Sequence, residues 1–266
     1  MNKAIFIYKN GNPPSLTTYE LLKKKLDGSG FDVLDEYDRD AGLVICIGGD
    51  GTFLEAIHKY DFPQQPIMGI NTGHLGFFEE ISPNQIDDFI FNYKQGYYTL
   101  QPLNTVRLVV TANGTNEVIQ ALNEVIIREK DLHNVHVNLS IGGEFIERFS
   151  GDGLLIATSA GSTAHNYSLG GSIVDPRLNL LQVTPIAPMN TTAYRAFTSS
   201  ILLPSDLPLG IQPDMGDNPC LKIFRDGVAV DYDHVTEMKV EISDTQIYLM
   251  RFEGYDFWTK VKDKFL

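Results

Sequence analysis

Residues 43–52 read Leu-Val-Ile-Cys-Ile-Gly-Gly-Asp-Gly-Thr, and this stretch decides the fold. Its first half is continuously apolar and rich in β-branched residues, which predicts a strand buried on both faces. Residues 53–60 continue with apolar side chains at helical spacing, so the glycines form a turn from a buried strand into a helix. A helix N-terminus attracts anions through its unpaired amides and its dipole, and glycine lets a phosphate approach the backbone closely. The stretch therefore predicts a phosphate-binding turn.

Asp50 is the one charged residue in this turn. Bound phosphates repel a carboxylate, so a plain phosphate cradle would avoid it. The carboxylate suits a general base that acts on an attacking hydroxyl, or a ligand of a metal ion carried by the phosphates. A simpler alternative is that Asp50 caps the following helix, with support from Thr52.

The first third of the chain alternates predicted strands with predicted helices. The strands are expected at 4–8, 31–34, 43–47 and 67–70, and capping boxes at Thr17 and Ser82 predict two helix starts. Repeated βα units predict a parallel, doubly wound sheet that binds ligands at the C-terminal ends of its strands. Asp50 follows such an end.

From about residue 96 the pattern changes to short extended runs separated by turns such as Asn113-Gly114, Gly142-Gly143 and Asp226-Gly227. We therefore expect an α/β domain at 1–98 and a mainly antiparallel β-sandwich domain at 99–252, with the tail 253–266 packing back on the first. In the second half only 161–169 looks helical. The extended runs are 106–111, 118–122, 125–128, 135–141, 144–149, 154–158, 221–224, 228–231, 237–242 and 246–252.

Composition restricts the class of partner and the compartment. The chain has 266 residues, a net charge of −13 and two cysteines, Cys46 and Cys220. The negative charge argues against nucleic acid as a partner, because binding it depends on Lys and Arg that neutralise phosphates. No apolar run is long enough to span a bilayer, and the N-terminus reads as a strand rather than a signal peptide. Two cysteines are too few for a disulfide framework, so we expect reduced thiols, no membrane contact and a cytoplasmic location.

Three further segments carry polar or small residues suited to a nucleotide. Asn123-Glu124 offers amide and carboxylate groups for ribose or base recognition, although an ordinary polar turn is the alternative. Residues 150–153 and 158–171 combine a lone carboxylate with dense hydroxyls and glycines, as a flat ligand close to the backbone requires; a Ser/Gly-rich connection is the alternative. Phe77, in 72–78, could stack on a base or be a core aromatic residue.

Together these segments closely resemble the NAD kinases, which phosphorylate NAD to NADP with ATP. Gly-Gly-Asp-Gly-Thr at 48–52 is also shared with lipid kinases and phosphofructokinases. The Asn-Glu pair at 123–124 and the Gly-Ser-Thr-Ala segment at 161–164 single out the NAD kinases, and all the matches follow the family order. The resemblance implies a two-domain fold with the site between the domains, and a homotetramer in which a neighbouring subunit completes the site. It implies Mg²⁺ with ATP as the cofactor and NAD and ATP as substrates, with inorganic polyphosphate as an alternative donor.

The resemblance also implies roles for individual residues. Asp50 would be the base that deprotonates the adenosine ribose 2′-hydroxyl of NAD. The phosphate contacts would come from Gly48, Gly49, Gly51 and Thr52. Asn123 and Glu124 would contact a ribose, and Asp152 the nicotinamide end. The other expected NAD contacts are Gly51, Phe77, Ser150, Ser159, Thr163, Ala164, His165, Ser168, Ala187 and Tyr194, of which Phe77, Thr163, Ala164 and Ser168 would line the adenine pocket.

Two positions depart from the family pattern. His165 stands in place of the usual tyrosine. Its imidazole offers less stacking area than a tyrosine ring and is titratable. Ser150 stands where many relatives carry a basic or larger polar residue. Two other functions share these motifs: a lipid or sugar kinase with the same glycine-rich turn, and a non-catalytic sensor that binds a dinucleotide.

Overall fold

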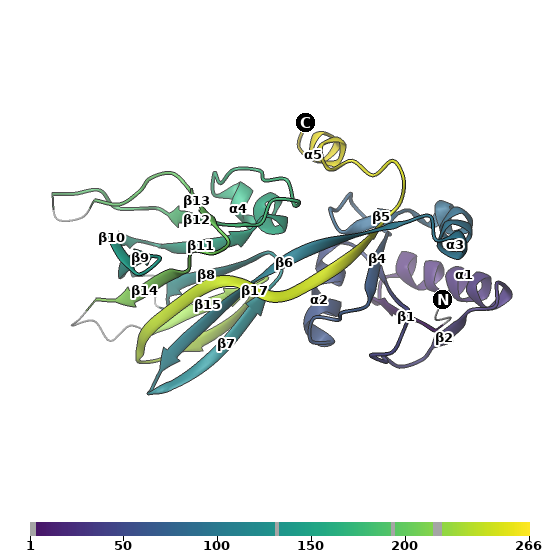
Figure 1. Cartoon of the computed structure of the whole chain (residues 1–266), viewed down its shortest axis with the longest axis horizontal. Coiled ribbons are helices and arrows are strands. Elements are labelled where there is room, and N and C mark those ends of the chain that lie inside the picture. The colour runs from purple at the N-terminus through teal and green to yellow at the C-terminus, as the bar shows by residue number, and fades with distance from the viewer. Residues whose placement is uncertain (1–3, 131–132, 193–194, 215–219) are drawn as a thin grey trace. The chain divides into compact units, whose positions relative to one another are not determined.

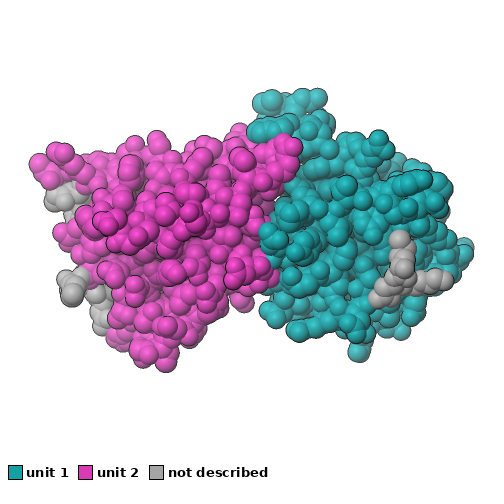
Figure 2. Space-filling view, viewed as in Figure 1, with its two compact units in different colours: residues 1–103, 246–266 teal, residues 104–245 magenta. Residues whose placement is uncertain are grey.

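The computed structural model describes residues 4–130, 133–192, 195–214 and 220–266. It divides the chain into two compact units, residues 1–103 with 246–266 and residues 104–245 (Figure 2). These boundaries differ by a few residues from those expected at 98/99 and 252/253. The difference arises because β6 (Thr99–Ala112) and β17 (Val235–Arg251) are long strands, and each contains a unit boundary within its length.

Unit 1 is built on a parallel sheet in the order β2-β1-β3-β4 (Figure 1). Every residue of β3 is buried, as its continuous apolar run predicts. β5 and the last residues of β17 both pair in parallel with β4. Helices α1 and α3 add their apolar residues to the core on one face of the sheet, and α2 covers the opposite face. The remaining bounds are β1 (Ala4–Lys9), α1 (Pro13–Gly28), β2 (Asp32–Leu34), β3 (Leu43–Gly48), α2 (Asp50–Lys59), β4 (Pro66–Asn71), β5 (Glu79–Ile81), η1 (Pro83–Gln85), α3 (Ile86–Gln95) and α5 (Phe257–Phe265).

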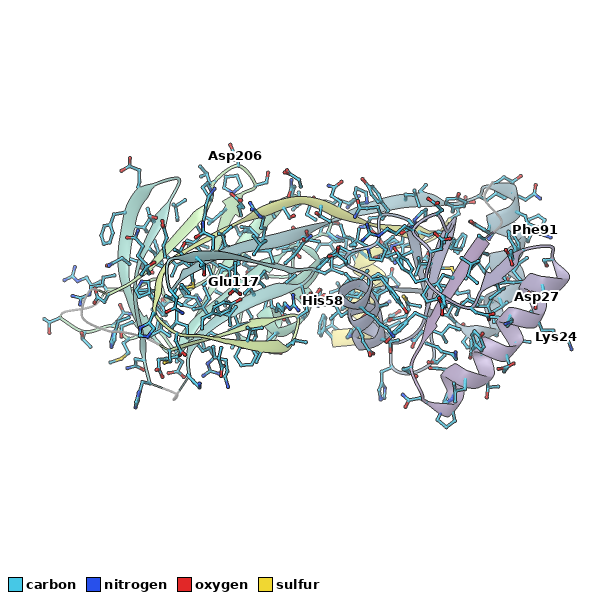
Figure 3. The ribbon with its side chains drawn as sticks, turned by 90° about the horizontal axis from the view of Figure 1, so that it is seen from below. Lys24, Asp27, His58, Phe91, Glu117 and Asp206 are labelled. Atoms are coloured by element: carbon cyan, nitrogen blue, oxygen red, sulfur yellow. The ribbon has the colours of Figure 1, made fainter. Side chains whose placement is uncertain are left out.

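The two expected capping boxes have different outcomes. The capping box at Ser82 is present. The helix that follows it, α3, buries its apolar residues Ile86, Phe89, Ile90 and Tyr93. The box at Thr17 is wrong: α1 begins at Pro13, and the Thr17 hydroxyl donates to the carbonyl of Pro13 instead. Proline fits the first turn of a helix because its missing N–H has no intrahelical partner there. Lys24 and Asp27 lie on the outer face of α1 and point away from the sheet (Figure 3).

Unit 2 is a β-sandwich, which with unit 1 confirms the expected fold class. One sheet has the order β13-β12-β11-β8-β15-β16, and the other contains β10-β9-β14-β17 with β6 and β7. Apolar residues of both sheets form one core that includes Leu108, Val125, Phe149 and Ile156. The remaining bounds are β7 (Thr115–Ala121), β8 (Glu124–Glu129), β9 (Val135–Ile141), β10 (Glu144–Gly151), β11 (Gly153–Thr158), η2 (Ala160–Thr163), α4 (His165–Ser168), β12 (Leu180–Ile186), β13 (Ile201–Pro204), β14 (Leu209–Pro213), β15 (Leu221–Arg225) and β16 (Val228–Tyr232).

All three expected hairpin turns join paired antiparallel strands, and Asn113 and Asp226 adopt the positive φ that such turns require. The sequence pattern missed β12, β13 and β14. Each contains a proline, a residue that argues against a central strand because it lacks an N–H donor. In the described residues, no helix combines the length and apolar character that crossing a bilayer demands.

Candidate active site

Asp50 is the first residue of α2, directly after the C-terminal end of β3. It does not cap this helix, because Gly49 occupies the N-cap position without a side-chain bond. Instead, Oδ1 of Asp50 accepts hydrogen bonds from the amides of Phe77 (2.9 Å) and Phe78 (3.0 Å), in the segment between β4 and β5. These bonds fix the carboxylate, while Oδ2 lies 3.5 Å from Nζ of Lys264. The side chain of Asp50 remains 30% exposed, so a ligand can reach it.

The glycines beside Asp50 have two different roles. A Cβ on Gly48 would clash with the side chain of Thr52, so this glycine is needed for packing. A Cβ on Gly49 or Gly51 would meet no atom within 4 Å, so the backbone there faces open space that a phosphate can approach. The hydroxyl of Thr52 accepts a hydrogen bond from the Asn10 amide at 2.9 Å.

Phe77 is buried against the C-terminal helix. Its ring centroid lies 5.8 Å from that of Phe257 and 6.0 Å from that of Phe265, both on α5. Nζ of Lys264 lies 5.0 Å from the centre of the Phe77 ring, within cation–π range. Phe77 is therefore a core aromatic residue, and through it α5 lies next to the glycine-rich turn at residues 48–52.

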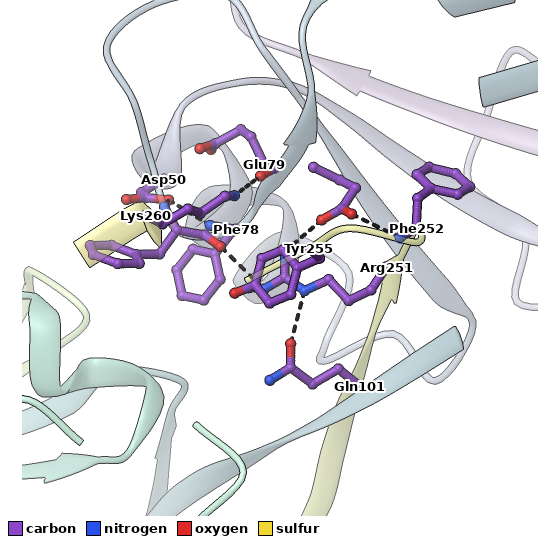
Figure 4. A network of polar contacts seen from close by, with 10 residues as sticks. Asp50, Phe78, Glu79, Gln101, Arg251, Phe252, Tyr255 and Lys260 are labelled. Carbon is purple, nitrogen blue, oxygen red and sulfur yellow. Dashed lines mark hydrogen bonds and ion pairs between the residues drawn. The ribbon is translucent and has the colours of Figure 1, made fainter. Parts of the chain in front are cut away.

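A polar network extends from Asp50 to the start of α5 (Figure 4). Arg251 donates to Glu80 (2.9 Å), to the Phe77 carbonyl (3.2 Å) and to the Tyr255 hydroxyl (2.9 Å). Lys260 donates to the backbone carbonyl of Glu79. Burial, with a contribution from Arg251, lowers the pKa of Lys260 to about 8. The network joins α5 to the segment that holds Asp50.

In unit 2, Asn123 and Glu124 stand at the start of β8 and are held by Asp226. The carboxylate of Asp226 accepts hydrogen bonds from the amides of Leu122, Asn123 and Glu124 at 2.7 to 3.1 Å. Oδ1 of Asn123 and Oε2 of Glu124 are buried without a hydrogen-bond partner. Buried polar atoms are normally paired, so these two acceptors suit donors such as ribose hydroxyls. Burial, followed by repulsion from Asp226, raises the pKa of Glu124 to about 8.

The segment 158–168 packs against the Asn123 turn. Thr158 binds the turn twice, through its amide to the Asn123 carbonyl and through its hydroxyl to the Leu122 carbonyl. A Cβ on Gly161 would clash with the Asn123 backbone, which explains the glycine. Next to this contact is a cavity of about 210 Å³ whose lining includes Glu124 and His165. Ser159 and Thr163 are buried in this segment, whereas Ala164 is half-buried and Ser168 is exposed.

The other expected residues of unit 2 lie where β10 and β11 meet the end of β12. Ser150 is fully buried, and its hydroxyl faces the Met189 sulfur at 3.7 Å. The Asp152 amide donates to the Ile186 carbonyl, and Ala187 adopts a φ of 45°. Arg128 lies 3.9 Å from the Asp152 carboxylate. Tyr194 lies outside the described residues.

Comparison with known families identifies the source of these motifs. The model of the ATP-NAD kinase N-terminal domain matches residues 19–98, and that of the C-terminal domain matches residues 122–252. The chain belongs to the ATP-NAD kinase family. A relative named NAD kinase from Finegoldia magna is 37% identical and aligns with 100% of this chain and 98% of its own length. One from Streptococcus gordonii is 32% identical, with coverages of 100% and 96%. The resemblance read from the sequence is thus confirmed.

Solved structures of the ATP-NAD kinase fold agree with the architecture. A yeast NADH kinase complexed with NADH superposes with a TM-score of 0.84 at 19% identity, covering 98% of this chain and 86% of that chain. An NAD kinase from Archaeoglobus fulgidus in complex with ATP gives a TM-score of 0.76 at 22% identity, with coverages of 97% and 98%. At these identities the likeness establishes the fold.

Sequence reasoning missed four residues that surround the expected site of this ATP-NAD kinase. Asp226 appeared only as part of a hairpin turn, although its carboxylate accepts hydrogen bonds from the amides of Leu122, Asn123 and Glu124, which lie far away in the sequence. Glu79, Lys260 and Lys264 were not singled out. Two signals were available: Glu79-Glu80 follows the apolar pair Phe77-Phe78, and Lys260 and Lys264 share one face of a helix at i,i+4 spacing.

A divalent cation is expected with ATP in this family. In the described parts of the chain, no group of three or more His, Cys, Asp or Glu side chains gathers to hold a metal ion. Mg²⁺ commonly binds through substrate phosphates with one or two carboxylates rather than in an all-protein cage. The described residues therefore do not form a metal site of their own.

Proposed function

We propose that this chain transfers the γ-phosphoryl group of ATP to the 2′-hydroxyl of the adenosine ribose of NAD, giving NADP. The observation that carries the proposal is the Asp50 carboxylate, fixed on one oxygen by two amides and exposed at the exit of a parallel strand in an ATP-NAD kinase chain. Asp50 would act as the general base that takes the hydroxyl proton. Phosphoryl transfer otherwise needs positioning and charge neutralisation, because its transition state is loose.

Unit 1 would hold the phosphates. The open backbone at Gly49 and Gly51 supports this role, together with the N-terminus of α2, while Gly48 and Thr52 shape the turn. The Archaeoglobus relative, described in complex with ATP, supports ATP as the donor. Mg²⁺ bound to ATP would neutralise part of the phosphate charge. Inorganic polyphosphate presents the same chemistry and is the alternative donor.

Unit 2 would recognise NAD. The unpartnered acceptors of Asn123 and Glu124 suit ribose hydroxyls, and His165 beside them would stack in place of the family tyrosine. Thr163, Ala164 and Ser168 would line the adenine pocket, whereas Phe77 packs in unit 1 as a core aromatic residue. Asp152 would serve the nicotinamide end, and Ser150 and Ser159 would also contact NAD. Ala187 and Tyr194 would serve the bound dinucleotide partly across subunits of a homotetramer. The free thiols of Cys46 and Cys220 support a cytoplasmic location.

The test is direct. Purified protein is incubated with ATP, Mg²⁺ and NAD, and NADP is detected with an NADP-specific dehydrogenase; we expect NADP to form. Binding of NAD without turnover would favour a non-catalytic sensor. Phosphorylation of a lipid or sugar in place of NAD would favour the wider kinase group that shares the Gly-Gly-Asp-Gly-Thr turn.

A further inference from the structure

Glu79, at the start of β5, is a buried carboxyl group that the proposed reaction leaves unexplained. It is only 4% exposed, and neither side-chain oxygen has a hydrogen-bond partner on another residue. Burying a carboxyl group without a hydrogen-bond partner lowers the stability of the fold, so its presence here calls for an explanation. The carboxyl points toward Asp50: a Cβ on Gly76 would clash with Oε2 of Glu79 and lie 2.6 Å from Oδ1 of Asp50. The two carboxyl groups thus converge on one point that a side chain at position 76 would fill.

Titratable groups from three elements lie near Glu79. These are Asp50 on α2, Lys260 and Lys264 on α5, and the Cys46 thiol on β3, which burial keeps neutral by raising its pKa. Burial and then repulsion from Asp50 raise the pKa of Glu79 to about 8, against smaller opposing effects of its own amide and the two lysines. Lys260 reaches the backbone carbonyl of Glu79 and not its carboxylate. At neutral pH Glu79 is therefore mostly a neutral acid beside the Asp50 carboxylate.

We propose that Glu79 is a positioning residue for the phosphoryl transfer, which acts through the neighbouring Asp50 carboxylate by keeping a second negative charge away from it. This proposal rests on the function proposed above. A neutral carboxyl group places no charge beside the Asp50 carboxylate. Once Glu79 ionises, two negative charges lie side by side and repel each other and the incoming phosphates. Turnover should therefore fall as Glu79 loses its proton.

The experiment compares kcat across pH 6.5–9.5 in the wild type and in Glu79→Gln, which keeps the shape and a donor but cannot ionise. In the wild type we expect kcat to fall above about pH 8, approaching tenfold per pH unit. In Glu79→Gln, kcat should instead fall by less than about twofold per pH unit above pH 8. Lys262→Gln, on the same helix with its side chain 69% exposed, is the matched control and should keep the wild-type profile.

The pKa of Lys260 is lowered to about the same value as that of Glu79. The variant Lys260→Met therefore shows which of the two groups causes the alkaline fall in kcat. An alkaline fall that disappears in Lys260→Met but persists in Glu79→Gln would overturn the proposal. If Glu79→Gln does not fold, Glu79→Asp, which retracts the carboxyl by one methylene, should shift the midpoint of the fall; an unchanged midpoint would also overturn it. A wild type that forms no NADP at any pH refutes the proposed function itself, whereas an active wild type with the same profile as Glu79→Gln refutes only the role of Glu79.

Discussion

At the scale of single residues, Asp50 shows how a carboxylate can be fixed without losing access to a ligand. One oxygen accepts two backbone amides, and the other faces Lys264. Asp50→Asn keeps an acceptor for the amides but removes the base. We expect folding and NAD binding to be retained and turnover to fall by at least about 10²-fold, the low end for general-base assistance. The coupled assay measures turnover, and near-normal activity would remove Asp50 from the catalytic role.

Glu124 allows a separate test of substrate binding. Its buried Oε2 has no protein partner, so we infer that NAD supplies one. Glu124→Ala should weaken NAD binding by about 10-fold, since a buried hydrogen-bonding group left without its partner costs about 1–3 kcal/mol. Isothermal titration calorimetry gives the dissociation constant. The exposed Glu144, changed to alanine, is the control, and an unchanged constant in Glu124→Ala would count against the assignment.

At the scale of elements, α5 connects the chain's end to the catalytic turn. Phe257 is 8% exposed and packs on Phe77, whereas its neighbour Trp258 is 50% exposed. We expect Phe257→Ala to lower the free energy of unfolding by roughly 3 kcal/mol, the low end for a buried phenylalanine, because a terminal helix can shift. Trp258→Ala should cost less than about 1 kcal/mol. Urea denaturation measures both, and equal losses would contradict this packing.

The elements also show what a sequence can and cannot reveal. Local pattern predicted β3, the Ser82 helix start and the hairpin at Asp226, since each depends on neighbouring residues. It misplaced the start of α1, which begins at Pro13 rather than at Thr17, and it missed β12, where a proline concealed a strand. The approach of Glu79 to Asp50 has no local signature, because it depends on strand order and on the missing side chain of Gly76. Motifs therefore located Asp50, the proposed base, but its surroundings required the fold.

At the scale of the whole molecule, each unit contains a deeply buried carboxyl group with a strongly raised pKa, and this predicts how stability depends on pH. Glu79 in unit 1 and Glu124 in unit 2 both rise from 4.5 to about 8. Between these values the folded chain binds more protons than the unfolded chain, so the free energy of unfolding falls as pH rises. Burial also raises the pKa of Glu147, which acts in the same direction. Lys260 is charged in both states below about pH 8, and the lowered pKa of Glu241 acts below 4.5, so neither contributes in this window.

We therefore expect the melting temperature to fall by at least about 4 °C between pH 5.5 and pH 8, given that 1 kcal/mol shifts Tm by roughly 2–4 °C at this size. The double variant Glu79→Gln with Glu124→Gln should lose most of this dependence, because neither side chain then ionises in either state. Glu237→Gln, at an exposed position of β17, should retain it. Differential scanning calorimetry across the pH range gives the three curves. A wild-type Tm that rises over this window would contradict the prediction. It would show that the folded chain does not bind more protons than the unfolded chain, and therefore that the two carboxyl groups are ionised in the folded chain.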